Sequence, residues 1–234
     1  MLKKLTGKAL IHTILIITSL LSIFPFIWLT STSLKGLGED IFAYPPHLIP
    51  SDFTWANYVD VWHRVNFMGY FWNSVIVAAL TVILNLVLSS LAAYPLARMS
   101  FKGKKFFFFA ILATIMIPFQ AIMLPVYIIT LKLHLIDSVN NVMGYIGLVM
   151  PFAVSAFGIF LMRQAFIKVP KEVEEAAIVD GCNVFQMFTR VVIPMVKPTL
   201  AVLAVFTFIG SWGEFLWPSI MLTKDAMYTL PVGI

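Results

Sequence analysis

Only one acidic or basic residue, Glu214, falls within the long apolar stretches of this sequence. A charged side chain at the centre of a bilayer costs about 2.5–3.5 kcal/mol on insertion scales, so it usually faces water or protein. We therefore expect Glu214 to line a water-filled pathway or to contact a neighbouring subunit. Trp212, Trp217 and Pro218 flank it, and a position near the membrane interface is the alternative.

Uncharged polar side chains in the same stretches are further candidates for a polar pathway. The alternative role for each amide or hydroxyl, Ser155 included, is a hydrogen bond between helices. Together with the glutamate, the pathway candidates are Asn73, Asn85, Gln120, Trp212 and Glu214.

The residues that would support catalysis or metal binding do not form recognisable patterns. The four histidines (His12, His47, His63, His134) are scattered, without the spacing of metal ligands. The phosphate-binding pattern G-x-x-x-x-G-K-[ST] does not occur, so we expect no ATP hydrolysis by that device, no metal and no cofactor in this chain. The single cysteine, Cys182, excludes a disulfide within the chain.

The elements that must position these residues follow from the composition. The chain has 234 residues, 60% of them hydrophobic and 12% charged, whereas soluble domains are about a quarter charged. This composition excludes a soluble enzyme, a disordered chain and a disulfide scaffold. Long apolar runs favour helices over the alternating segments of about ten residues that are typical of outer-membrane barrels. The sequence predicts an all-α polytopic membrane protein.

Five stretches are long enough to cross a bilayer of about 30 Å. We expect spans at about 9–30, 71–97, 106–130, 141–162 and 199–221, after a short N-terminal segment, 1–8. Residues 31–70 form the loop after the first span, with a short interfacial helix from Asn57 to Arg64. Residues 164–198 connect the fourth and fifth spans.

The distribution of basic residues predicts the orientation. With a cytoplasmic N-terminus, twelve of the sixteen lysines and arginines lie inside, in 1–8, 98–105 and 163–197. The loop 31–70 is then external. This placement accounts for the formal net charge of +5, so nucleic acid is not needed as a partner. An uncleaved first span fits better than a signal peptide, because its apolar run exceeds the usual 7–15 residues.

The segment 164–198 predicts two helices separated by a turn. Pro170 suits the first helical position, and Glu172, Glu174 and Glu175 place negative charge in the first turns. Asp180-Gly181 ends this helix, and Asn183 caps a second, amphipathic helix that ends before Pro194. The second helix either lies on the membrane interface or docks a cytoplasmic partner.

The same segment carries a resemblance to a known family. Glu175-Ala176-Ala177, then three residues, Gly181, nine residues and Val191-Val192-Ile193-Pro194 resemble the EAA signature of ABC-importer permeases, EAA-x3-G-x9-I-x-L-P. Val191 replaces the usual Ile and Ile193 the usual Leu. Five other stretches are similar to the carbohydrate branch, especially the second permease of maltose-type systems: 70–74, 92–98, 118–125, 211–218 and 229–233.

The resemblance implies a type I permease in a prokaryotic plasma membrane that imports sugar by alternating access. It implies a second homologous permease, two ATPase subunits that carry ATP and Mg²⁺, an external solute-binding protein, and surrounding lipid. Such permeases have a sixth span, which is missing here, so we expect this chain to be a fragment or truncated product. The ATPases would dock on the EAA loop (164–198) at Glu174, Glu175, Ala176, Ala177, Asp180, Gly181 and Pro194.

Three alternatives remain open. Within the same family, the solute could be glycerol phosphate or another polar molecule. An ion-coupled secondary carrier is a second possibility, although such carriers usually hold several ionisable groups within the membrane. A membrane scaffold without transport activity is the third, and the EAA signature disfavours both of these.

Overall fold

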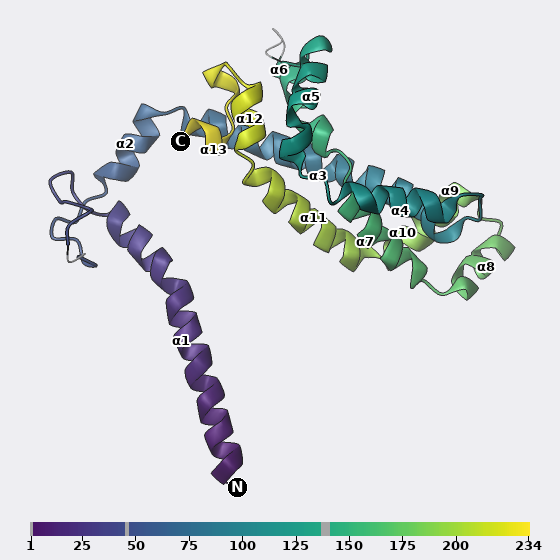
Figure 1. Ribbon diagram of the computed structural model, residues 1–234, viewed down its shortest axis with the longest axis horizontal. Helices are drawn as coiled ribbons and strands as arrows, with labels where there is room; N and C mark the ends of the chain where they lie inside the picture. Colours follow the sequence, from purple (N-terminus) through teal and green to yellow (C-terminus); the bar gives the residue numbers. More distant parts are fainter. Residues whose placement is uncertain (1, 45–46, 137–140) are drawn as a thin grey trace. The chain divides into compact units, whose positions relative to one another are not determined.

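The computed structural model describes residues 2–44, 47–136 and 141–234, and its regular structure is helical throughout, apart from one isolated bridge between Lys35 and Phe53 (Figure 1). The prediction of an all-helical protein is confirmed. The chain divides into two compact units, Met1–Val65 and Asn66–Ile234, which are described separately. Residues 45–46 of the expected external loop and 137–140 before the expected fourth span lie outside the described residues.

The first unit contains a long helix, a polar connection and a short helix. Helix α1 (Leu2–Ser33) is apolar on all sides over Leu10–Ser33, as a membrane span requires. Helix α2 (Ala56–Arg64) begins one residue before the expected start. Its Asn57 amide donates to the backbone oxygens of Ser33 (3.0 Å) and Lys35 (2.8 Å), which ties α2 to the end of α1.

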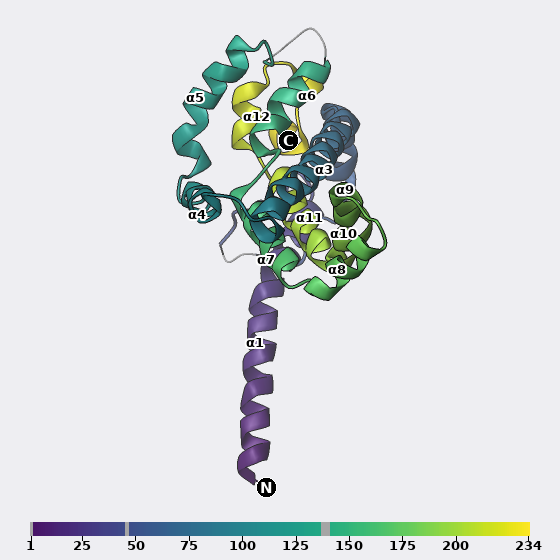
Figure 2. The same cartoon turned by 90° about the vertical axis from the view of Figure 1, so that its right-hand side faces the viewer.

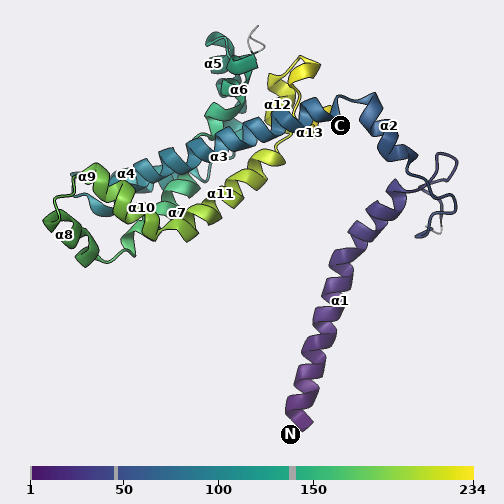
Figure 3. The same ribbon diagram turned by 180° about the vertical axis from the view of Figure 1, so that it is seen from behind.

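The second unit is built on one long helix, α3 (Phe67–Arg98). Helices α7 (Ala156–Ile167) and α11 (Lys197–Trp212) lie along it (Figures 1 and 3). Gly158 allows α7 to approach α3 closely, because a Cβ there would lie 2.7 Å from Ser89 Oγ. Small residues at such crossings are typical of helices that pack in membranes.

Two of the expected continuous spans are broken in the structure. The span expected at 106–130 is a pair of helices that meet at 96° just before Pro118, and the span expected at 141–162 bends by 60° between Phe152 and Ala156, where Ser155 caps the second helix. Pro118 lacks the backbone N–H that would continue α4, and hydropathy alone does not detect either break. The two pairs are α4 (Lys104–Thr114) with α5 (Phe119–Lys132), and α6 (Asn141–Val149) and η1 (Met150–Phe152) with α7.

The expected fifth span, 199–221, is also not one helix. Helix α11 ends at Trp212, so that Glu214 lies in a break before the next helix. At its start, α11 meets the helical segment Val184–Met195 at 79°. In the described residues, two helices can cross a membrane alone, and three bent pairs raise the number of candidate crossings to five. The segment between α7 and α11 holds α8 (Lys171–Val179), α9 (Val184–Gln186), η2 (Met187–Val192) and α10 (Ile193–Met195). The C-terminal elements are α12 (Leu216–Met221), η3 (Asp225–Met227) and α13 (Leu230–Gly233).

Two apolar clusters hold the second unit together at opposite ends of α3. At one end, Tyr94, Phe166 and Phe188 make edge-to-face contacts with centroids 5.1–6.2 Å apart. At the other end, the indole of Trp217 is fully buried and donates to the backbone oxygen of Gly147 (3.2 Å). Figure 1 shows α8–α10 near the first end of α3 and α5, α6 and α12 toward the other end, and Figure 2 shows the same two groups of helices in a view nearly along α3. The EAA loop and the polar residues near Glu214 are therefore separated along α3.

Candidate translocation cavity and coupling loop

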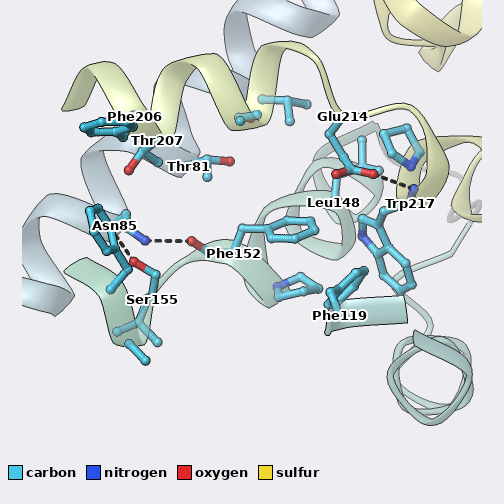
Figure 4. A pocket seen from close by; sticks show the side chains of 18 of the residues that line it. Thr81, Asn85, Phe119, Leu148, Phe152, Ser155, Phe206, Thr207, Glu214 and Trp217 are labelled. Atoms are coloured by element: carbon cyan, nitrogen blue, oxygen red, sulfur yellow. Dashed lines mark hydrogen bonds between the residues drawn. The ribbon is translucent and has the colours of Figure 1, made fainter. Parts of the chain in front are cut away.

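A cavity of about 470 Å³ lies among α3, α5, η1, α11 and α12 within the second unit (Figure 4). Aromatic and aliphatic side chains form most of its wall, as in most small-molecule sites. Its polar and charged lining residues are Ser74, Thr81, Asn85, Thr114, Ser155, Thr207, Ser211, Glu214 and Thr229.

Asn85 is the most constrained of these residues. It is 2% exposed, and its amide nitrogen donates to the backbone oxygen of Phe152 (3.1 Å). Its amide oxygen accepts from the hydroxyls of Ser89 (3.3 Å) and Ser155 (3.5 Å). Ser155 also accepts from the backbone N–H of Gly158 and so caps α7. This network joins α3 to the break between η1 and α7 and fixes one wall of the cavity.

Glu214 faces the cavity from the break between α11 and α12. Its Oε1 accepts from the backbone N–H of Trp217 (3.1 Å), three residues further along the chain (Figure 4). This bond satisfies one of the N–H groups that the first turn of a helix leaves unpaired. The expected charged residue therefore lies at the cavity, in the short connection between α11 and α12 rather than on a continuous helix.

Three of the expected pathway residues do not line the cavity. Asn73 donates to the backbone oxygens of Ala226 and Tyr228 (both 2.9 Å) and accepts from the Tyr145 hydroxyl (2.6 Å). Its amide is thus used to hold the C-terminal segment against α3. Gln120 is exposed on α5, and Trp212 stacks on Phe208 and meets Phe71 edge to face.

Two threonines that the sequence analysis did not single out belong to the same cavity. The hydroxyls of Thr81 and Thr229 are buried without a hydrogen-bond partner in the described structure. The spacing of Thr81, Asn85 and Ser89, four residues apart on one helix, places them on one face of α3. This polar stripe in an apolar span is the sequence signal that could have found Thr81; Thr229 lies outside it, near the C-terminus.

The EAA loop adopts the two-helix arrangement that its sequence predicts. Helix α8 (Lys171–Val179) begins one residue later than expected, because Pro170 is its N-cap. Gly181 has φ +81°, the left-handed conformation that glycine tolerates best. Asn183 and Gln186 form a capping box at the start of the second helical segment. That segment comprises α9 (Val184–Gln186), the π-helical turn η2 (Met187–Val192) and α10 (Ile193–Met195).

The two adjacent glutamates of the EAA loop point in different directions. Glu174 Oε1 lies 3.0 Å from Nε of Arg98, at the end of α3, and the two side chains are 18% and 9% exposed. The Arg98 guanidinium also donates to the backbone oxygen of Val169. Glu175, in contrast, is exposed. Glu174 thus attaches α8 to its own chain, whereas Glu175 is available to another molecule.

The other residues of the signature are likewise either packed within this chain or exposed on its surface. Ala177 is 7% exposed and packs in the cluster with Tyr94 and Phe188. Ala177 therefore contributes to packing within this chain. The residues on the outer surface of the loop are Ala176, Asp180, Gly181 and Pro194.

Comparison with known proteins agrees with these features. Residues 85–234 match the family model for the "Binding-protein-dependent transport system inner membrane component". The chain belongs to this family, and it is thus related to inner-membrane transport components of the ABC-importer class.

Individual relatives include permeases for sugars and for glycerol phosphate. The arabinooligosaccharides transport system permease protein AraQ of Halalkalibacterium halodurans is 35% identical over 79% of this chain and 64% of its own length. AraQ of Bacillus subtilis is 34% identical over 92% and 75%, respectively. The sn-glycerol-3-phosphate permease protein UgpE of Yersinia enterocolitica is 34% identical over 95% and 79%.

A solved structure shows the same fold. It is a chain of a bacterial ABC transporter involved in the import of the acidic polysaccharide alginate. The TM-score is 0.81 at 27% identity, covering 97% of this chain and 77% of that one. The predicted fold of an ABC-importer permease is confirmed.

Proposed function

We propose that this chain is a permease subunit of an ATP-driven importer that takes up a carbohydrate by alternating access. The observation that carries the proposal is the geometry of the EAA loop. Helix α8 is fixed to α3 through the Arg98–Glu174 ion pair and presents Glu175 on its exposed side. A short helix held in this way transmits the movement of a docked partner to the spans as a rigid body.

The proposed function requires several partner proteins. Two ATPase subunits bind ATP and Mg²⁺ and dock on the EAA loops of this chain and of a second, homologous permease. An external solute-binding protein delivers the solute. The N-terminus and the EAA loop then lie in the cytoplasm, on the side where basic residues are concentrated.

The solute class is supported by the relatives and by the cavity. The AraQ relatives are named for arabinooligosaccharides, and the cavity combines hydroxyl, amide and aromatic groups that suit a sugar. Glycerol phosphate is the second candidate, because the UgpE relative matches 95% of this chain at a similar identity.

The test is ATP-dependent uptake by the complete permease, reconstituted in proteoliposomes with its partner permease, ATPases and solute-binding protein. We expect uptake of a radiolabelled neutral oligosaccharide that requires ATP and persists when ion gradients are collapsed. Glu175→Ala should lower ATPase co-purification and uptake about tenfold or more, if Glu175 forms a desolvated contact with the ATPase. Glu172→Ala, at an exposed position of the same helix, is the matched control. Uptake that needs an ion gradient and ignores ATP would refute the proposal.

A further inference from the structure

The cavity has an unusual charge distribution for a site that accepts a polar solute. Glu214 is the sole acidic side chain among its described lining residues, and none of those residues is a lysine, arginine or histidine. Proteins recognise phosphate and carboxylate groups chiefly with arginine, lysine or helix N-termini. The N-termini of α7 and α12 that border the cavity are already capped by Ser155 and Glu214. An anionic solute would therefore meet the Glu214 carboxylate and no cationic side chain among the described lining residues.

The polar groups of the cavity suit hydroxyl groups instead. Thr81 is 2% exposed and Thr229 is 4% exposed, and neither hydroxyl has a partner in the described structure. A buried hydroxyl without a partner carries a desolvation cost, which a ligand that both donates and accepts hydrogen bonds relieves. Sugar hydroxyls do both, and so match threonine at any orientation of its O–H.

Glu214 also offers a hydrogen-bond acceptor to a solute hydroxyl. The Trp217 N–H holds Oε1, and the second carboxylate oxygen, Oε2, makes no recorded bond within the described residues and can accept from a solute hydroxyl (Figure 4). Such charge-assisted bonds are stronger than those between neutral groups. The carboxylate therefore attracts a hydroxyl donor and repels an anion at the same position.

The aromatic side chains of the cavity also suit a sugar. The rings of Phe119, Phe152 and Phe206 lie around the polar groups in Figure 4, and Phe119 and Phe152 contact each other with centroids 4.9 Å apart. The C–H faces of a sugar ring are apolar and pack well against aromatic side chains. A small phosphate ester offers little of this surface.

We infer that this cavity is a subsite for an uncharged, polyhydroxylated solute, and that Glu214 is a specificity-determining residue that rejects anionic ones. The inference rests on the proposed function and names the substrate class within it. It distinguishes this chain from the two anion importers among its relatives, whose names refer to glycerol phosphate and to the acidic polysaccharide alginate.

The test compares three solutes in the reconstituted complete transporter: a neutral oligosaccharide, a mannuronate oligosaccharide and sn-glycerol 3-phosphate. The same solute-binding protein serves every variant, so a change in the uptake ratio between solutes reports the cavity and not the binding protein. We expect Glu214→Gln to raise the ratio of anionic to neutral uptake about tenfold or more, because it removes the charge and keeps a hydrogen-bond acceptor.

Two further variants test the hydroxyl contacts. Thr81→Val and Glu214→Ala should each lower uptake of the neutral oligosaccharide about tenfold, which corresponds to the loss of about 1.4 kcal/mol. Thr130→Val is the matched control, because Thr130 is buried outside the cavity and its hydroxyl bonds to its own helix. ATPase co-purification should be unchanged in all of them, which shows that the permease is folded.

Three results would overturn the inference. The wild-type transporter could take up either anion as fast as the neutral sugar, Glu214→Gln could leave the ratio unchanged, or Thr81→Val could match Thr130→Val. In each case ATP-dependent uptake would still support the proposed function. Uptake of none of the three solutes would refute the proposed function as well.

Discussion

The attachment of α8 to α3 can be tested by removing Glu174. Nε of Arg98 lies 3.0 Å from Oε1 of Glu174, and both side chains are largely buried. At an effective dielectric constant of about 20, the attraction at this distance is roughly 5.5 kcal/mol, and desolvation of the two groups cancels part of it. Removing one partner of a buried pair costs about 3–5 kcal/mol, and partial exposure of Glu174 lowers the expected cost of Glu174→Ala to roughly 2–3 kcal/mol.

Hydrogen–deuterium exchange of the α8 amides measures this cost directly. A loss of about 2 kcal/mol should speed exchange roughly thirtyfold if α8 opens as a unit. Glu172→Ala, on the exposed side of α8, should change exchange less than about threefold. The effects of Arg98→Ala and Glu174→Ala on α8 should be less than additive, because both variants remove the same ion pair, although Arg98→Ala also removes the bond to Val169.

The functional consequence is loss of coupling. In the reconstituted transporter, Glu174→Ala should keep basal ATP hydrolysis and lose most of the ATP-dependent solute uptake, because α8 is no longer held against α3. Two results would refute this account of Glu174. One is exchange in α8 equal to that of Glu172→Ala; the other is a double variant whose effects add, which would show that the two residues act independently.

Two further predictions concern the same loop. Gly181→Ala should weaken ATPase co-purification about fivefold, because alanine at φ +81° costs about 1 kcal/mol of backbone strain. A Cβ at Gly181 meets no atom within 4 Å, so a steric clash does not add to this cost. Gly38→Ala, at another glycine with open space, is the control, and equal co-purification of the two variants would contradict the strain argument. Cys182, the one thiol of the chain, should react with a membrane-impermeant maleimide in inside-out vesicles stripped of ATPase and not in right-side-out vesicles, and labelling only from the outside would reverse the proposed orientation.

The local features of the EAA loop were predictable from the sequence. Gly181, Asn183 and Pro170 act through their own backbone geometry or through hydrogen bonds to residues close along the chain. Their positions in the sequence therefore suffice to predict a helix, a turn and a second capped helix. The all-helical membrane class follows in the same way from hydropathy, which each apolar stretch carries by itself.

The partners of individual polar side chains depended on the tertiary structure. Asn73 and Asn85 lie on one span and have the same chemistry, yet Asn73 holds residues about 150 positions away and Asn85 lines the cavity. Glu174 and Glu175 are neighbours in one short helix, and the position of Arg98 across the fold decides which of them turns inward. Hydropathy and helix periodicity describe one segment at a time, whereas the role of a buried polar group is decided by which donors and acceptors distant segments bring to it.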